Sequence, residues 1–138
     1  MIILIVEDNL AHQKITEYVL KKSNVQAQII VVRDGQEVLD YLFRKDTFAD
    51  SAQYPLPDII LLDLNLPKRD GREVLKVIKS YSSFKEIPVV ILSTSDREED
   101  VTFAFEHGAV AYISKASGFD KFNAELGAIG KYARRPTG

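Results

Sequence analysis

The sequence lacks cysteine, a strong net charge and any long hydrophobic segment, and each absence excludes a class of protein. With no cysteine among 138 residues, disulfides, thiol nucleophiles and thiolate metal sites are excluded. The 18 basic and 20 acidic residues give a net charge of -2, which argues against nucleic-acid or anionic-membrane partners. The apolar run after Met1 stops at Glu7, too soon for a signal peptide or a membrane span. We therefore expect a cytoplasmic protein.

What is present fits one compact domain, and its most informative stretch is the apolar run at 59–62. The hydrophobic content is 46%, enough for a single core. The run leads directly into Asp63, and Pro67, which cannot donate a hydrogen bond to a sheet, follows. This pattern predicts a strand buried on both faces of a parallel sheet, ending near Asp63. Open α/β sheets place their chemistry at such strand ends.

Strand and helix patterns alternate along the whole chain. Apolar runs at 2–6, 29–32, 88–92 and 109–114 predict four more strands, and a helix is expected after each strand. Asp34 and Asp70 are predicted to cap the second and third helices. Right-handed crossovers then give an α/β fold, a doubly wound (βα)5 three-layer sandwich with a five-stranded parallel sheet, of flavodoxin-like or receiver type.

The helical patterns also predict which side chains are buried. The expected buried side chains are Ala11, Ile15, Tyr18 and Val19 in the first helix, Val101, Ala104 and Phe105 in the fourth, and Phe119, Phe122, Leu126 and Ile129 in the fifth. The fourth helix is predicted to open at Ser95 and close at His107-Gly108, and the fifth to run from Ser117 to about Tyr132. Residues 44–57 are expected to form a long surface loop, a binding segment or a tolerated insertion, and 134–138 a frayed tail.

Polar side chains follow four of the strands and should meet at one sheet edge. Glu7 and Asp8 follow the first strand, Asp63 the third, Ser93 the fourth and Lys115 the fifth. Neighbouring carboxylates repel one another unless a cation lies among them, and an incomplete set of hard oxygen ligands favours Mg²⁺.

We expect Asp8 and Asp63 as direct ligands of this cation, Glu7 directly or through water, and the Asn65 backbone carbonyl as a further ligand. With Lys115 and Ser93, the set would stabilise a phosphoryl group transferred onto an Asp63 oxygen. Each residue alone has a simpler explanation, and His12 and His107 are expected to be exposed or capping residues rather than phosphocarriers.

Taken together, these residues resemble the receiver domain of two-component response regulators over essentially the whole chain. The matching positions are Glu7-Asp8 for the metal pair (Mg²⁺ or Mn²⁺), Asp63 for the phosphoacceptor, Ser93 and Tyr112 for the switch pair, and Lys115 for the phosphate-contacting lysine. The stretch 62–75 and the long loop before it are similar to stand-alone receivers that partner bacterial, including cyanobacterial, phytochrome histidine kinases.

The resemblance implies phosphoryl transfer from a kinase phosphohistidine to Asp63, followed by self-catalysed hydrolysis modulated at Asn65 and Ser95. The protein would then be a signalling phosphoprotein and not an enzyme beyond its own phosphorylation and dephosphorylation. Phosphorylation would draw Ser93 toward the phosphoryl group and Tyr112 inward, changing the face made by the fourth helix, fifth strand and fifth helix.

One position departs from the family, which usually has proline after the lysine, joined by a cis bond. Here Ala116 follows Lys115, and a cis bond before a non-proline residue costs about 3 kcal/mol. The sequence therefore predicts either a trans bond with a reshaped loop or a strained cis bond.

Residues 1–138 are expected to form a single receiver domain without a separate output domain, so output would pass through protein contacts. The expected contacts are a histidine kinase, a downstream target or a second copy of the chain through the face just described. Three alternatives stay open: a phosphorylation-independent scaffold of receiver fold, an Asp-nucleophile phosphohydrolase, and an FMN carrier. Asn65 in place of a second acid disfavours the hydrolase, and Glu7-Asp8 would repel the FMN phosphate.

Overall fold

The structure is a computed structural model that describes residues 1–133. Within that range the strands are β1 (Ile2–Val6), β2 (Gln28–Val32), β3 (Ile59–Leu62), β4 (Val89–Ser93) and β5 (Ala111–Ser114). The helices are α1 (Leu10–Lys22), α2 (Gly35–Leu42), α3 (Gly71–Ser80), α4 (Glu98–Glu106) and α5 (Phe119–Gly127). Two short 3-10 helices are η1 (Asp46–Phe48) and η2 (Ile129–Tyr132). The predicted tail, 134–138, lies outside the described residues.

All strand pairs are parallel, and the order in the sheet is β2-β1-β3-β4-β5. From β1 the chain adds β2 on one side of the sheet, and it then adds β3, β4 and β5 in turn on the other side. β1 and β3 pair with Val6 opposite Leu62. Loops that leave these two strands diverge to opposite faces and open a crevice at their carboxyl ends. The first and third strands therefore deliver Glu7-Asp8 and Asp63 to the same place.

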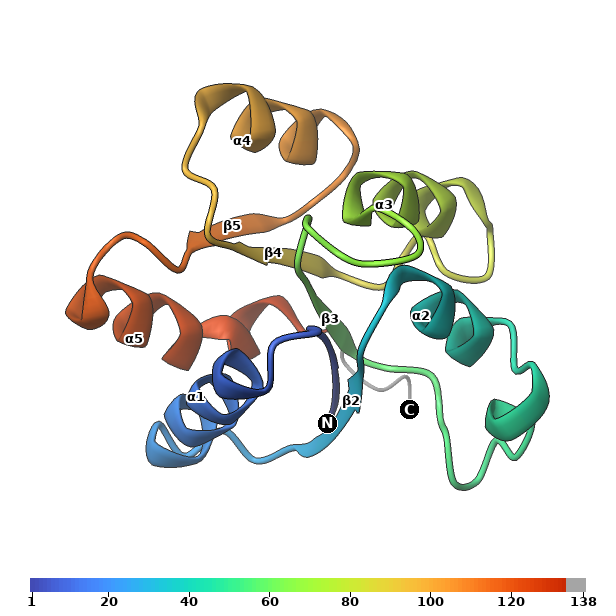
Figure 1. The fold of residues 1–138 in the computed structure, drawn as a ribbon. Helices are drawn as coiled ribbons and strands as arrows, with labels where there is room; N and C mark the ends of the chain where they lie inside the picture. The colour runs from blue at the N-terminus through green and yellow to red at the C-terminus, as the bar shows by residue number, and fades with distance from the viewer. Residues whose placement is uncertain (134–138) are drawn as a thin grey trace.

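Helices cover both faces of the sheet, so the predicted three-layer sandwich is confirmed. Figure 1 shows α1 and α5 side by side on one face and α2, α3 and α4 on the other. The buried side chains divide accordingly, because alternate residues of each strand point to opposite faces. Leu4, Ile60 and Ile91 join the core under α2 and α3, while Ile5, Leu61 and Val90 join the core under α1 and α5. No described helix is long and apolar enough to cross a membrane.

The predicted helix ends are largely confirmed. Asp34 accepts a hydrogen bond from the Glu37 N–H at 2.7 Å, and Asp70 accepts one from the Arg72 N–H at 2.8 Å. Each cap satisfies an N–H that has no partner within its own helix. After α4, Gly108 takes a φ of 96°, the left-handed conformation expected of a glycine that ends a helix.

The predicted buried face of α1 is wrong for Ala11, Ile15 and Tyr18. All three are exposed, and the buried residues are Gln13, Thr16, Val19 and Leu20. The Gln13 side chain is satisfied because its amide donates to the Glu7 carbonyl oxygen at 2.7 Å. Burying a glutamine costs little stability when its side chain has a backbone hydrogen-bond partner. A prediction from the apolar residues alone therefore misplaced the inward face of α1, which includes the polar Gln13 and Thr16.

Corrections are also needed in the last two helices. Ser95 does not cap α4, which begins at Glu98 after Arg97, and Phe105 is 50% exposed rather than buried. Phe119 is 60% exposed, although Phe122, Leu126 and Ile129 are buried as predicted. The last helix is also divided, because α5 ends at Gly127 and the 3-10 turn η2 continues to Tyr132.

The loop at 44–57 is more ordered than its sequence indicated. It contains η1, and Phe48 and Tyr54 pack their rings on Tyr41 of α2 with centroids 5.2 and 5.9 Å away. The Tyr41 hydroxyl donates to the Pro55 carbonyl at 2.6 Å, and burial raises the pKa of Tyr41 to about 12. These contacts hold the loop against α2.

Candidate functional site

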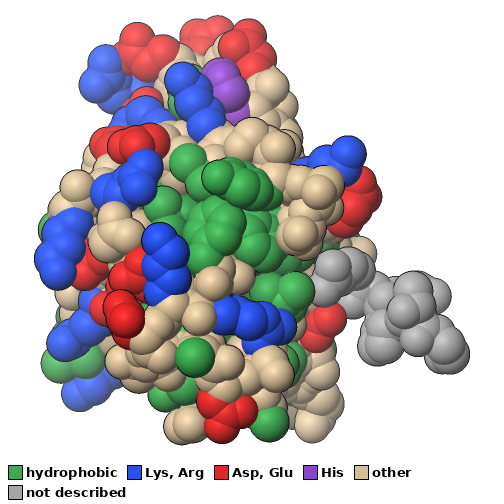
Figure 2. All heavy atoms as spheres, turned by 90° about the vertical axis from the view of Figure 1, so that its right-hand side faces the viewer, with side chains coloured by type: hydrophobic (Ala, Val, Ile, Leu, Met, Phe, Trp, Pro, Cys, Tyr) green, Lys and Arg blue, Asp and Glu red, His purple; other side chains and the backbone are tan. Residues whose placement is uncertain are grey.

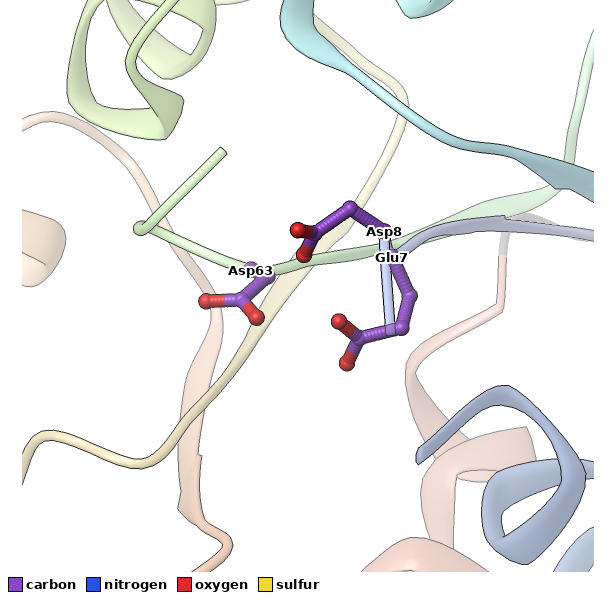
Figure 3. A group of neighbouring side chains, drawn as sticks. All are labelled: Glu7, Asp8 and Asp63. Atoms are coloured by element: carbon purple, nitrogen blue, oxygen red, sulfur yellow. The ribbon is translucent and has the colours of Figure 1, made fainter. Parts of the chain in front are cut away.

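Three carboxylates meet where β1 and β3 end. Glu7 and Asp8 directly follow β1, and Asp63 directly follows β3. One oxygen from each lies within 4.8 Å of the others, and Figure 3 shows the three side chains converging. Glu7 and Asp63 are buried, whereas Asp8 is exposed, so the cluster opens to solvent on one side. Burial raises the pKa of the Glu7 carboxyl, although the hydrogen bond from Lys115 opposes this shift.

Lys115 brings a positive charge into the acidic cluster from the end of β5. Its side chain is only 8% exposed, and its ammonium donates to Asp63 Oδ2 at 3.1 Å and to Glu7 Oε1. The Lys115 N–H also donates to the Ser93 carbonyl at 2.7 Å, which fixes the backbone from which the side chain extends. The ammonium thus offsets part of the repulsion between two buried carboxylates.

The chemistry of the donor set fits a hard divalent cation. Carboxylate oxygens are the preferred ligands of Mg²⁺ and Mn²⁺, and an exposed side leaves room for waters or a phosphate oxygen. The Asn65 N–H donates to Asp63 Oδ1 at 3.0 Å, so its backbone lies beside the cluster while its side chain is exposed. Whether the Asn65 carbonyl ligates stays a prediction.

The structure places Ser93 and Tyr112 in one loop network beside this cluster. The Ser93 hydroxyl is fully buried at the end of β4 and accepts from the Ser95 N–H at 3.2 Å. The Tyr112 hydroxyl donates to the Ser95 carbonyl at 2.7 Å, and burial raises the pKa of Tyr112. Both predicted switch residues therefore contact the loop between β4 and α4 through Ser95.

Two residues of this network were missed by the sequence analysis. Asp100 of α4 accepts from Ser95 Oγ at 2.5 Å and from Arg72 of α3 at 2.7 Å. The hydrogen bonds from Ser95 and Arg72 hold the pKa of Asp100 below its usual range. An acid in the first turn of a helix normally indicates only a favourable interaction with the helix dipole, so its sequence position carried no sign of these partners.

His12 was expected to be an exposed or capping residue, but its ring lies at the site. It belongs to the first turn of α1, and its Nδ1 is 3.2 Å from Lys115 Nζ and 3.6 Å from Glu7 Oε1. The only signal in the sequence was its position four residues after Asp8, one helical turn into the element that follows the acidic pair. His107 closes α4 as expected, with its ring against the Phe103 carbonyl.

The loop after Lys115 takes the first of the two predicted forms. Every peptide bond within residues 1–133 is trans, including Lys115–Ala116. Ser114 organises the turn: its hydroxyl accepts from the Ala116 N–H at 3.1 Å, and its carbonyl accepts from Ser117 Oγ at 2.8 Å. Gly118 then takes a φ of 97° before α5 begins. Lys115 reaches Asp63 without a proline after it.

Comparison with known proteins identifies relatives over nearly the full chain. A model of the response regulator receiver domain matches residues 3–126. The response regulator Rcp1 of Synechocystis sp. is 43% identical over 115 residues, covering 83% of this chain and 76% of Rcp1.

Two solved structures show the same fold. The Mn²⁺-bound form of Rcp1 has a TM-score of 0.83 at 38% identity, covering 94% of this chain and 91% of Rcp1. The phosphorylated cyanobacterial phytochrome response regulator RcpA has a TM-score of 0.84 at 39% identity, covering 96% and 92%.

Proposed function

The chain belongs to the response regulator receiver family, and from that premise we propose that Asp63 accepts a phosphoryl group from a kinase phosphohistidine. As a receiver, the protein is a two-component signalling protein. The observation that carries the proposal is the position of Asp63. Its buried carboxylate contacts Lys115 and shares one acidic cluster with Glu7 and Asp8.

In the transfer, an Asp63 oxygen attacks phosphorus while the bond from phosphorus to the donor nitrogen breaks. The electron pair of the broken bond returns to the donor imidazole. Lys115, 3.1 Å from Asp63 Oδ2, neutralises charge on a phosphoryl oxygen, and the Asn65 N–H holds Asp63 Oδ1 in place. Both groups lie beside Asp63 before the donor arrives, and the ammonium would exchange one of its present contacts for the phosphoryl oxygen.

Glu7, Asp8 and Asp63, with the Asn65 carbonyl, would hold Mg²⁺ or Mn²⁺. A bound divalent cation would neutralise charge on the carboxylates and on the phosphoryl oxygens. The cluster geometry supports this assignment, and the relative Rcp1 has a Mn²⁺-bound form.

Release of the signal would be hydrolysis at the same site. Water attacks phosphorus, the bond from phosphorus to the Asp63 oxygen breaks, and inorganic phosphate leaves. Asn65 and Ser95 are the proposed modulators of this step. The Asn65 side chain is exposed and its N–H donates to Asp63 Oδ1, and the Ser95 N–H donates to the Ser93 hydroxyl, which supports both assignments.

We propose Ser93 and Tyr112 as the residues that transmit phosphorylation to the surface. The Ser93 hydroxyl would leave the Ser95 N–H and donate to a phosphoryl oxygen. Because Tyr112 is bonded to the Ser95 carbonyl, movement of this loop would break or re-form that hydrogen bond. The face formed by α4, β5 and α5 would then differ between the two states.

A histidine kinase is the proposed partner upstream, and a phytochrome-type kinase is supported by the likeness to RcpA. Downstream, the signal would pass through protein contacts on the face formed by α4, β5 and α5. A second copy of the chain is one such partner. Phe105 of α4 and Val110 before β5 support it, since both are exposed apolar residues.

The test is intact mass spectrometry after incubation with acetyl phosphate and Mg²⁺. The wild type should gain one phosphoryl group, while Asp63→Asn or addition of EDTA should abolish the gain. Asp120→Asn, an exposed aspartate in the first turn of α5, is the matched control and should behave as wild type. Continuous turnover of p-nitrophenyl phosphate would instead support a phosphohydrolase, and no gain under any condition would support a phosphorylation-independent scaffold.

A further inference from the structure

The Lys115 ammonium has three N–H groups, and the structure gives it three acceptors. Two are the carboxylates of Glu7 and Asp63, and the third is Nδ1 of His12 at 3.2 Å. A lysine ammonium only donates, so a hydrogen bond between these two atoms uses His12 Nδ1 as the acceptor. Three possible acceptors therefore surround the ammonium.

The His12 ring has no evident role in the helix that carries it. The cap of α1 is Asn9, whose side chain accepts from the His12 N–H at 3.0 Å, so the cap involves only the backbone of His12. Beside the ring, a cavity of about 350 Å³ opens between α1 and α5, and His12 and Lys115 are the charged or titratable residues that line it. With open space on one side, the ring is held by its hydrogen bond rather than by tight packing.

We propose that His12 is a positioning residue for phosphoryl transfer, a role that rests on Asp63 being the phosphoacceptor. Lysine has a flexible four-carbon stem, so two carboxylates alone allow its ammonium to shift between them. The third acceptor, on α1, ties the ammonium to one place beside Asp63 Oδ2. Fixing a charged group before the reaction lowers the reorganisation needed when charge moves onto the phosphoryl oxygens.

The experiment compares variants that remove or keep this acceptor. His12→Leu keeps bulk but removes the acceptor, and His12→Asn can place an amide oxygen near the Nδ1 position. We expect His12→Leu to slow phosphorylation of Asp63 by acetyl phosphate and Mg²⁺ about threefold to tenfold, and His12→Asn to recover most of the rate. His107→Leu, which removes a histidine far along the chain at the end of α4, should leave the rate unchanged.

A double-mutant cycle shows whether the effect acts through the lysine. In a Lys115→Met background, the additional change His12→Leu should have no further effect on the rate. A threefold to tenfold loss in both backgrounds would overturn the proposal, and so would a wild-type rate in His12→Leu.

The second readout needs neither metal nor phosphate. In ¹⁵N NMR of the metal-free protein, the Lys115 ammonium protons should exchange slowly in the wild type and in His12→Asn, and faster in His12→Leu. Equal exchange in all three would refute the hydrogen bond. If the wild type were not phosphorylated on Asp63, the proposed function would fail while this NMR test still decided the contact. Circular dichroism checks folding, and His12→Ala replaces the leucine variant if the latter does not fold.

Discussion

Gly71 allows the first turn of α3 to lie directly against the backbone that carries Asp63. Its N–H donates to the Leu64 carbonyl at 2.9 Å. A Cβ added at this position would come 2.2 Å from the Asp63 carbonyl oxygen and 2.6 Å from Leu64 Cα. Both contacts are with backbone atoms, which cannot turn away as a side chain would. The backbone that follows the proposed phosphoacceptor can therefore pack this closely against α3 only because residue 71 has no Cβ.

We therefore expect Gly71→Ala to lower the free energy of unfolding by about 1 to 3 kcal/mol through overpacking. Urea titration followed by circular dichroism measures this change. Because the displaced backbone carries Asp63, phosphorylation by acetyl phosphate should slow as well.

Gly130→Ala is the control for this substitution. No heavy atom lies within 4 Å of the position that a Cβ at residue 130 would occupy. The free energy of unfolding of this variant should therefore stay within about 0.5 kcal/mol of that of the wild type. Equal stability of the two alanine variants would contradict the close approach at Gly71.

Among the elements, α4 is attached to the domain in an unusual way. Its buried residues are Asp100 and Ala104, so little apolar surface holds it. Instead, Asp100 accepts hydrogen bonds from Arg72 of α3 and Ser95 of the preceding loop, and Ser95 in turn accepts from Tyr112 of β5. Elements with few buried apolar contacts open at low free energy. The helix of the proposed signalling face is thus fixed by a polar network that includes the switch loop.

Asp100→Asn should weaken this network, because a neutral amide attracts Arg72 less than a carboxylate does. We expect a loss of about 1 to 3 kcal/mol in unfolding free energy at neutral pH, with faster amide hydrogen exchange in α4. In the wild type, the contribution of Asp100 to the free energy of unfolding depends on pH, because the pKa of Asp100 is lower in the folded protein than its ordinary value of 3.8. Its stabilisation is complete above the unfolded pKa and is lost as pH falls below about 4 through the folded pKa.

Urea titrations at pH 7 and at pH 3 measure both effects. The difference between wild type and Asp100→Asn should be largest at pH 7 and shrink at pH 3. Arg72→Met provides a second arm, because it removes the partner and should also speed exchange in α4. A gap between wild type and Asp100→Asn that is the same at both pH values would exclude the carboxylate as its source.

For the molecule as a whole, the site residues at the ends of strands could be predicted from the sequence. The site residues whose position depends on the orientation of a helix could not. The runs ending at Val6 and Leu62 fixed the strands, and parallel strands necessarily bring Glu7, Asp8 and Asp63 together. The positions of His12 and Asp100 depend on which side of a helix faces the sheet. That side was mispredicted where polar residues are buried, as with Gln13 on α1.

The exposed aromatic residues of the described chain lie on several elements: Tyr18 on α1, Tyr81 just after α3, Phe105 on α4 and Phe119 at the start of α5. Phe105 belongs to α4, in the face proposed for partner binding, whereas Phe119 of α5 lines the cavity that α5 shares with α1. A second apolar area lies on the side of α2 and α3, where Figure 2 shows hydrophobic side chains gathered among charged ones. There Phe43 of the α2 end packs on Tyr81 and Phe84, with ring centroids 4.9 and 5.1 Å away, and Tyr81 is 48% exposed. Both areas offer apolar surface to a second copy of the chain.

We expect a homodimer through α4, β5 and α5, because Phe105 there is exposed without a described ring partner, whereas Tyr81 is already paired with Phe43. In a two-fold dimer each substitution acts twice, so Phe105→Ser should weaken association by about 3 kcal/mol or more. Tyr81→Ser, the matched control on the other area, should leave association unchanged. Sedimentation velocity with and without beryllofluoride measures both variants. If the wild type sediments only as a monomer under both conditions, the proposed dimer is refuted. If only Tyr81→Ser weakens association, the interface lies on the side of α2 and α3 instead.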